Sequence, residues 1–328
     1  MVWKTVVVIL AAAAAAEVSV TAYFYMRTMK RANTTTGRTM KMAGTDWDQY
    51  MPFIEERKER LLAQEHEDVY LMSDDGLKLH ATWFPNGNPG RVMIGFHGYT
   101  SRGMSDFIGL SDYYLRNGYS MLLPDARAHG DSEGEYIGFG CLDRFDALKW
   151  INWVVGRCGE DVQIALHGIS MGGSTVLMAS GQKLPPQVKG IVSDCAFISP
   201  KEVFTHVLNS MYHIPASPIL IPADALNKKK AGYGLDDCRA DVEVRKAQVP
   251  ILLIHGDKDT FVPCEMCEEI YKNCPEGTEK LIIPGAAHAE SYYKETETYE
   301  EALDRFYASC GLMQAEQPAG EPGQGAGE

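Results

Sequence analysis

A serine flanked by glycines lies where an apolar run meets a helical stretch. Residues 168–172 read GISMG, one residue after VQIAL and just before STVLMAS. In a G-x-S-x-G turn the chain passes so sharply from strand to helix that the flanking positions tolerate almost no side chain, and the serine hydroxyl stands above the sheet edge. We therefore predict Ser170 as a nucleophile. The backbone N–H of Met171, at the start of the helix, is the expected first half of an oxyanion hole.

The same pattern occurs a second time, at residues 130–134, which read GDSEG. No apolar run ends directly before this copy, and a loop continues after it. Asp131 and Glu133 would also oppose an oxyanion next to the serine. We therefore do not expect Ser132 to be the nucleophile.

A serine nucleophile needs a histidine base, and in this kind of site the chain order is serine, acid, histidine. Four of the nine histidines follow Ser170: His206, His213, His255 and His288. The first two fall in an irregular segment, and His255 precedes both main candidate acids, which favours a turn histidine. His288 follows the apolar run KLIIP in a loop of small residues. We predict that His288 takes the serine proton and later returns it to the leaving group.

The acid is expected at the carboxyl end of the strand PILLIHG, where residues 256–263 read GDKDTFVP. Asp257 and Asp259 are both candidates, since either could accept the imidazole N–H while the other caps a turn or the next helix. Asp194, after the strand KGIVS, is a third candidate. Residue types alone do not separate Asp257 from Asp259.

The second oxyanion donor is expected in the segment FHGYT at residues 96–100, which follows another apolar run. Gly98 permits a close approach of the backbone. We predict the N–H of Tyr99 as the donor, with that of Gly98 as the alternative, and the His97 side chain as a structural hydrogen-bonding group. Gly98, Tyr99 and Thr100 are also candidates for lining the substrate pocket.

Short apolar runs alternate with amphipathic stretches through most of the chain. At the start of this region, apolar and polar residues alternate on both sides of Asp74-Asp75-Gly76, which predicts a β-hairpin with its turn at these residues. Because helices separate the later strands, the pattern predicts an α/β fold with a mostly parallel, doubly wound sheet of about eight strands. After the hairpin, the expected strands are 91–97, 119–124, 162–167, 188–193, 250–255 and 279–283, and the expected helices are 103–116, 140–156, 171–182, 264–273 and 297–309.

This alternation is interrupted at about 197–245, where prolines mix with apolar residues and a run of three lysines. We predict a small insertion at the carboxyl edge of the sheet that forms a lid over a binding crevice. A purely structural excursion is the alternative. The aromatic and methionine content of this segment suits an apolar acyl or aryl group.

The amino-terminal residues 5–26 are apolar over about the length that crosses a bilayer, with the single charge Glu17. Five basic residues follow before Asp46, whereas Lys4 alone precedes the apolar run. The pattern predicts a single-pass transmembrane anchor with a basic flank over 1–41, and it predicts that the catalytic domain is cytoplasmic. A cleaved signal peptide, with a secreted or extracytoplasmic domain, is the alternative.

The rest of the chain divides by composition. Residues 42–65 predict an amphipathic linker helix. Residues 66–312 are expected to form the catalytic domain, and 313–328, rich in Gly, Pro and Glu, are expected to be disordered.

Charge and cysteine content bear on nucleic-acid binding, on the redox compartment and on metal binding. Lys and Arg total 31 against 44 Asp and Glu, for a net charge of -13, which disfavours nucleic acid. The eight cysteines show no regular spacing, which favours a reducing compartment. Cys264, Cys267 and Cys274 could form half a metal site, but no second cysteine or histidine pair follows at zinc spacing. We expect neither a metal nor an organic cofactor.

Together these residues resemble the α/β-hydrolase superfamily over roughly 67–310. The chain is similar to bacterial, often membrane-anchored members near the serine aminopeptidase-like and cinnamoyl-esterase-like branches. The resemblance implies that the acid is the second aspartate of G-D-x-D-x-x-V-P, which is Asp259, and that Asp257 is structural. It also implies that the D-x-R-x-H-G-x-S stretch at 125–132 is chiefly a structural turn.

The predicted function is a serine hydrolase that cleaves a small-molecule carboxylic ester through an acyl-enzyme. Amide hydrolysis of the aminopeptidase or acyl-peptidase type is the first alternative, although no residues mark an amine-binding pocket. A lipase or thioesterase is the next. A non-catalytic, membrane-tethered binding protein is the least favoured, because a scaffold need not keep a triad in order.

Overall fold

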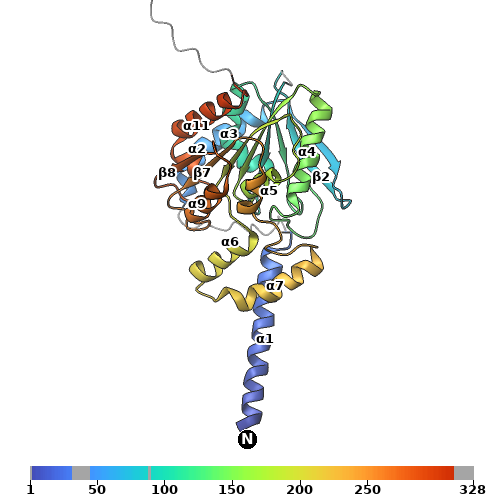
Figure 1. The fold of residues 1–328 in the computed structure, drawn as a ribbon, viewed down its shortest axis with the longest axis vertical. Coiled ribbons are helices and arrows are strands. Elements are labelled where there is room, and N and C mark those ends of the chain that lie inside the picture. Colours follow the sequence, from blue (N-terminus) through green and yellow to red (C-terminus); the bar gives the residue numbers. More distant parts are fainter. Residues whose placement is uncertain (1, 32–44, 88–89, 314–328) are drawn as a thin grey trace, which may run out of the picture.

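An eight-stranded sheet forms the centre of the computed structural model, which describes residues 2–31, 45–87 and 90–313 (Figure 1). Strand β2 is antiparallel to both of its neighbours, and the other adjacent pairs are parallel. The predicted α/β fold with a mostly parallel sheet is confirmed. In spatial order the strands are β1 (Glu67–Met72), β2 (Lys78–Phe84), β4 (Ser120–Pro124), β3 (Arg91–Phe96), β5 (Gln163–Ile169), β6 (Val188–Asp194), β7 (Ile251–Gly256) and β8 (Glu279–Ile283).

Helices cover both faces of this sheet, which explains why the central strands are apolar on both sides. In β3, for example, Val92 and Ile94 belong to one hydrophobic core, and Met93 belongs to the other. The first core includes residues of α4 (Asp143–Cys158), α5 (Met171–Ser180) and α9 (Cys264–Asn273), and the second includes residues of α2 (Met51–Leu62), α3 (Gly103–Arg116) and α11 (Thr296–Ser309).

The segment between β6 and β7 leaves the sheet as a small group of helices beside the carboxyl ends of the strands (Figure 1). Buried apolar residues of its first helices belong to the same core as α5. The segment therefore covers the sheet edge at which parallel strands of an α/β fold present their functional residues. Its elements are α6 (Pro200–His206), a π-helical turn η3 (Val207–Met211), α7 (Ala216–Lys230), α8 (Ala240–Glu243) and the short 3-10 turn η4 (Val244–Lys246).

The first helix, α1 (Val2–Thr28), corrects the prediction of a membrane anchor. In the described part of the chain, no helix combines the length and the apolar character needed to cross a bilayer. The aromatic end of α1 is also partly covered by protein, because Phe24 and Tyr25, together with Met29 just after the helix, are buried. The prediction of a transmembrane helix is therefore wrong. The predicted membrane sidedness is also wrong, because it depended on that helix.

Two further elements complete the described chain. The 3-10 turn η2 (Trp47–Tyr50) leads into α2, which lies on α3 and forms an ion pair between Arg57 and Asp112. The four-residue helix α10 (Ser291–Lys294) lies between β8 and α11. The predicted disordered tail, apart from Met313, and the basic flank beyond Arg31 lie outside the described residues.

Candidate active site

Ser170 lies at the sharp junction between β5 and α5. Its backbone has a φ of 55°, in the left-handed region that side chains other than glycine rarely adopt. A Cβ atom at Gly168 would overlap the backbone of Gly172, and one at Gly172 would overlap the Phe96 carbonyl. The two glycines are therefore required by close packing, and the strained turn holds the serine at the carboxyl edge of the sheet.

The structure brings Ser170 together with the predicted base and with one of the candidate acids. The Nε2 atom of His288 lies 2.8 Å from Ser170 Oγ. The Nδ1 atom of the same ring lies 2.6 Å from Asp259 Oδ2. All three residues are buried. With the Nδ1 proton donated to Asp259, Nε2 is the acceptor that faces the serine hydroxyl.

Asp259 is oriented by backbone amides of its own loop. Its Oδ1 accepts hydrogen bonds from the N–H groups of Phe261 and Val262, at 2.9 and 2.8 Å. Burial alone would raise the pKa of this carboxyl, but the charge of His288 and the hydrogen bonds from His255 and His288 hold the pKa well below its usual value. Asp259 is therefore ionised and aimed at the imidazole.

The other two candidate acids point elsewhere. Asp257 Oδ1 accepts a hydrogen bond of 2.6 Å from the N–H of Gly285, which ties the end of β7 to the loop that carries His288. Asp194 accepts a hydrogen bond of 3.1 Å from Tyr299, and burial raises its pKa to about 6. Of the three candidate acids, Asp259 is therefore the one that pairs with His288 Nδ1.

Two of the remaining histidines after Ser170, His255 and His206, contact the loop of the acid. His255 Nε2 lies 2.8 Å from the Val262 carbonyl and 3.3 Å from Asp259 Oδ2, so this histidine buttresses the acid's loop. Sequence reasoning treated it as a turn histidine and missed its contact with the acid. His206, in α6, contacts the Thr260 carbonyl at 2.9 Å and thereby connects the segment between β6 and β7 to the same loop.

The loop after β3 offers amides near the serine, and two of them already have acceptors. Asp106 Oδ2 accepts the N–H of Gly98 at 2.7 Å. His129 Nε2 accepts the N–H of Thr100 at 3.1 Å. Of the two predicted donors in this loop, the N–H of Gly98 is therefore already bonded to Asp106. The N–H of Met171 belongs to the first turn of α5, where amides have no acceptor within the helix.

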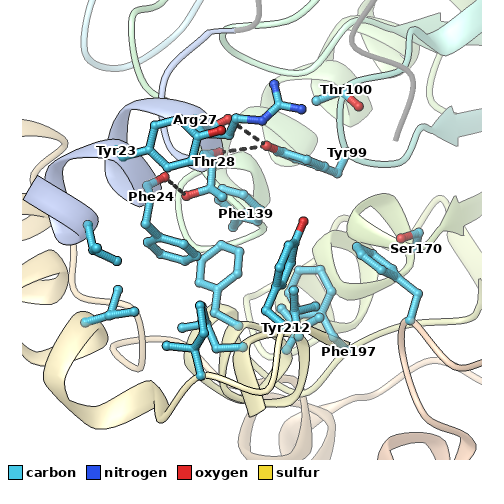
Figure 2. Close-up of a pocket in the computed structure, with 18 residues that line it drawn as sticks. Tyr23, Phe24, Arg27, Thr28, Tyr99, Thr100, Phe139, Ser170, Phe197 and Tyr212 are labelled. Atoms are coloured by element: carbon cyan, nitrogen blue, oxygen red, sulfur yellow. Dashed lines mark hydrogen bonds between the residues drawn. The ribbon is translucent and has the colours of Figure 1, made fainter. Parts of the chain in front are cut away.

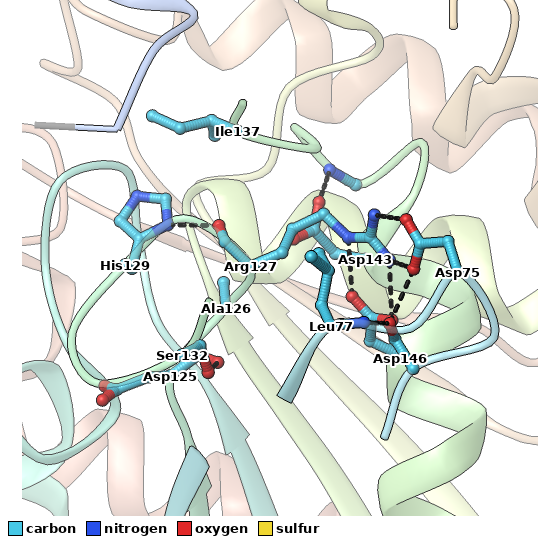
Figure 3. A network of polar contacts seen from close by, with 12 residues as sticks. Asp75, Leu77, Asp125, Ala126, Arg127, His129, Ser132, Ile137, Asp143 and Asp146 are labelled. Atoms are coloured by element: carbon cyan, nitrogen blue, oxygen red, sulfur yellow. Dashed lines mark hydrogen bonds and ion pairs between the residues drawn. The ribbon is translucent and has the colours of Figure 1, made fainter. Parts of the chain in front are cut away.

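The second G-x-S-x-G copy forms a turn in which Ser132 is buried. Ser132 Oγ donates to the Asp125 carbonyl at 2.6 Å and accepts the N–H of His80 at 2.8 Å. Figure 3 shows the adjoining network, in which the Arg127 guanidinium binds both oxygens of Asp146 at 2.8 Å. The stretch from 125 to 132 therefore stabilises its own turn and connects that turn to the backbone of β2.

The same turn also supports the loop that carries the candidate oxyanion donor. His129 Nδ1 lies 3.0 Å from the Arg127 carbonyl, so its Nε2 is left to accept the N–H of Thr100. Burial lowers the pKa of His129 to about 3, which keeps the ring neutral and Nε2 an acceptor. Thr100 itself has a φ of 57°, so the bond from His129 holds a strained residue.

An apolar cavity of about 200 Å³ opens at Ser170 (Figure 2). Its walls include the predicted pocket residues Tyr99 and Thr100, but they also include five residues of α1 that sequence reasoning assigned to a membrane anchor. The break from alanines to aromatic residues near the end of α1 was the signal that could have identified them. The five are Val20, Tyr23, Phe24, Arg27 and Thr28.

Two groups in the described residues have metal-binding atoms close together. One consists of Cys195, Asp259 and His288, and the other of His80, Asp125 and Asp131. In the first, both His288 nitrogens already face Asp259 and Ser170. In the second, His80 Nδ1 lies 2.8 Å from Asp125 and Nε2 lies 3.0 Å from Asp68. These hydrogen bonds use the atoms that a metal would need.

Two family models match the chain. One, described as alpha/beta hydrolase fold, matches residues 91–216, and the other, described as serine hydrolase, matches 168–289. The overlap of the two models contains the turn at Ser170, and the second model extends to His288. The chain is a member of the α/β-hydrolase superfamily.

Curated relatives of this α/β-hydrolase are identical to it at about a quarter of the aligned residues. The uncharacterized protein YqkD of Bacillus subtilis is 27% identical over 222 residues, which cover 68% of this chain and 72% of the relative. The uncharacterized protein YfhR of Escherichia coli K12 is 26% identical over 252 residues, which cover 74% of this chain and 81% of the relative. These relatives therefore match over most of their length.

Solved structures share the α/β-hydrolase fold at lower identity. The Pyrococcus furiosus esterase Pf2001 superposes with a TM-score of 0.63 and 22% identity, over 76% of this chain and 93% of that chain. A puromycin-hydrolyzing peptidase of Mycobacterium tuberculosis gives a TM-score of 0.58 at 17% identity, over 77% of this chain and 40% of that chain. Because both an esterase and a peptidase share this fold, the fold does not select the bond that is cleaved.

Proposed function

We propose that this α/β-hydrolase is a carboxylesterase in which Ser170 is the nucleophile, His288 the general base and Asp259 the acid that orients it. The observation that carries the proposal is the unbroken series of hydrogen bonds from Ser170 Oγ through His288 to Asp259, at 2.8 and 2.6 Å. The series begins at the wall of a cavity, where a substrate carbonyl can reach the hydroxyl.

In the first half of the reaction, Ser170 Oγ attacks the ester carbonyl while its proton passes to His288 Nε2. The carbonyl oxygen becomes an oxyanion that the N–H groups of Tyr99 and Met171 bind. The C–O bond to the alcohol then breaks, and the protonated imidazole returns the proton to the departing oxygen. An acyl-enzyme on Ser170 and a free alcohol result.

In the second half, water replaces the alcohol. His288 Nε2 takes a proton from the water as its oxygen attacks the acyl carbonyl, and the same oxyanion hole binds the second tetrahedral intermediate. The bond to Ser170 Oγ breaks, the serine regains its proton from His288, and a carboxylic acid leaves. All protons and electrons balance without a cofactor, and Asp259 stabilises the imidazolium formed in both halves.

We favour an ester over an amide because an alcohol departs more easily than an amine. The apolar walls of the cavity at Ser170 also suit the hydrocarbon part of an acyl group. Among the described residues that line this cavity, none has a carboxylate that could bind the amino terminus of a peptide.

The test is labelling of the full-length chain with a fluorophosphonate probe, followed by peptide mapping, with the Ser170→Ala variant in parallel. The expected result is one adduct, on Ser170, and no adduct in the variant. The labelled protein and the Ser170→Ala variant should both fail to hydrolyse p-nitrophenyl esters. The unlabelled wild type should hydrolyse p-nitroanilides of the same acids far more slowly than the esters. Labelling elsewhere, or undiminished hydrolysis by a folded Ser170→Ala variant, would contradict the proposal.

A further inference from the structure

The apolar cavity at Ser170 is built partly by a segment outside the catalytic fold. It extends from Ser170 past Phe139 and Phe197 to Tyr212, in the segment between β6 and β7, and to α1 (Figure 2). Val20 lies two helical turns before Thr28, so α1 contributes about 12 Å of wall. Both family models begin well after this helix, at residues 91 and 168.

Aromatic and polar contacts hold this part of α1 against the segment between β6 and β7. The rings of Phe24 and Phe204 meet edge to face at 5.4 Å, and the Phe204 ring also meets Phe139 at 5.0 Å. Tyr25 donates a hydrogen bond of 3.3 Å to the buried amide oxygen of Asn227, in α7. Since these side chains are buried, α1 is packed into the protein here and does not merely lie beside it.

The residues that follow α1 form hydrogen bonds with backbone groups of the catalytic domain. The N–H of Ile137 donates to the Met29 carbonyl at 2.9 Å. The Arg31 guanidinium donates to the carbonyls of Ser132 and Gly130, at 2.5 and 2.6 Å. The second G-x-S-x-G copy thus anchors the end of α1.

A direct hydrogen bond also joins α1 to the loop of the candidate oxyanion donor. Tyr99 donates from its hydroxyl to the Thr28 carbonyl at 3.1 Å (Figure 2). The Tyr99 ring stacks on Phe139 at 5.3 Å. A chain bound at Ser170 would therefore pass Tyr99 and run along α1.

A second cavity indicates which part of an ester enters the first. It shares Ser170, Tyr99 and Phe261 with the cavity along α1, but its other walls include Ala289 and Tyr293, which follow His288 in sequence. The leaving oxygen must lie within reach of His288 Nε2, because this atom returns the proton. The alcohol therefore fits the cavity beside His288, and the acyl group fits the one along α1.

We propose that α1 is a specificity element of the active site, and that the cavity it lines binds an unbranched aliphatic acyl chain. This proposal rests on the proposed function. The side chains of Val20, Tyr23 and Phe24 contact the distal part of the chain, and Tyr99 and Phe139 contact the part near the carbonyl. Arg27 is the charged member of the lining, so the cavity offers little to a polar acyl group.

The test compares Val20→Trp with Val18→Trp on p-nitrophenyl acetate, butyrate, hexanoate, octanoate and decanoate, in the full-length chain. Val20 lines the cavity, whereas Val18 lies on the same helix outside the lining. Both side chains are exposed, at 43% and 68%, so neither substitution disturbs a buried core. Circular dichroism and thermal unfolding of both variants verify the fold.

We expect the kcat/KM of the wild type to rise by up to about fourfold per added methylene until the cavity is full. Val20→Trp should lower the ratio of the octanoate or decanoate kcat/KM to the acetate kcat/KM at least tenfold, because the indole fills the distal end of the cavity. Val18→Trp should follow the wild type at every length. Tyr23→Ala, which removes a lining ring, gives a second measure and should lower selectivity for the longest esters.

Two outcomes would overturn the proposal while leaving the proposed function intact. One is a flat chain-length profile in the wild type, and the other is an identical profile for Val20→Trp and Val18→Trp, each with activity that depends on Ser170. Ester hydrolysis that survives in Ser170→Ala would instead remove the proposed function itself. The two failures are therefore distinguishable.

Discussion

The chain contains the pattern G-x-S-x-G twice, and the two copies have different structures. At 168–172 the serine stands between β5 and α5, with its hydroxyl 2.8 Å from His288 and at the wall of a cavity. At 130–134 the serine is buried in a turn, with its hydroxyl bonded to backbone groups of His80 and Asp125. The copies share residue types but not the elements on either side.

This difference shows that the elements around the motif determine what the serine does. A strand before the turn and a helix after it direct the hydroxyl away from the sheet and supply helical amides next to it. Without these elements, the hydroxyl of Ser132 points into the protein and bonds to the backbone of His80 and Asp125. The copy at 130–134 still serves the site, because it binds Arg31 and adjoins the histidine that holds the Thr100 amide.

Substituting the two serines is the largest test of this comparison. Ser170→Ala should lower kcat by at least about 10⁴-fold while leaving the free energy of unfolding nearly unchanged. Ser132→Ala should keep kcat within a few-fold but lower the free energy of unfolding by about 1–3 kcal/mol, since the His80 amide loses its buried acceptor. Ester kinetics and urea unfolding of both variants measure this. An inactive but fully stable Ser132→Ala variant would contradict the comparison.

The two aspartates at the end of β7 test the same contrast in the acid. Asp259→Asn should lower kcat by about 10³–10⁴-fold, because an amide cannot stabilise the imidazolium or fix its tautomer. Asp257→Asn should cost less than about tenfold, since its partner is the Gly285 amide. Kinetics with one ester at a fixed pH decide between them. The reverse order would transfer the role of the acid to Asp257.

His129 joins the two regions, and its loss should have an intermediate effect. His129→Leu removes the acceptor of the Thr100 N–H and should lower kcat by about tenfold with little change in KM, because the candidate oxyanion loop loosens while the cavity remains. We expect His129→Asn, which keeps an acceptor oxygen, to recover part of the loss. An unchanged kcat in His129→Leu would show that this histidine does not position the loop.

A carboxyl beside the second copy should produce a smaller effect, on stability. Burial alone would raise the pKa of Asp125, but the hydrogen bond with His80, the charge of His97 and two backbone amides hold it well below its usual value. A carboxyl with a depressed folded pKa stabilises the fold above its unfolded pKa of about 3.9, and this contribution is lost as the pH falls through the folded pKa.

We therefore expect Asp125→Asn to be less stable than the wild type at pH 7, with a difference that shrinks below pH 4. Asp131→Asn is the matched control, because its exposed carboxylate is not the group that His80 binds. Thermal unfolding between pH 7 and pH 3 measures both. A difference for Asp125→Asn that stays constant or grows toward low pH would contradict the assigned cause.

Much of the fold followed from local pattern. The expected strand at 279–283 and the expected helices at 103–116 and 264–273 coincide with β8, α3 and α9. Short apolar runs and amphipathic periodicity specify such elements because burial on two faces or one face of an element is a local requirement. The serine in its turn and the last histidine were also recognisable, since each lies beside an apolar run with small neighbours.

The choice between neighbouring groups required the tertiary structure. Asp257 and Asp259 are two residues apart, and only the packing of the β8 loop brings one of them to His288 and directs the other to Gly285. Gly98 and Tyr99 are adjacent, and only the folded chain shows that the carboxylate of Asp106 binds the Gly98 amide. Residue types cannot distinguish such pairs, because the deciding partner comes from another element.

The amino-terminal helix shows most clearly the difference between what the sequence determined and what the tertiary structure decided. Its apolar composition determined that α1 would be a helix in need of a nonpolar surface, and the sequence pattern alone favoured lipid. The tertiary structure decided otherwise for the aromatic end of the helix, where Phe24 and Tyr25 contact the helices α6 and α7. Hydrophobic burial is non-directional, so a sequence specifies which residues must leave water, and only the folded chain specifies what covers them.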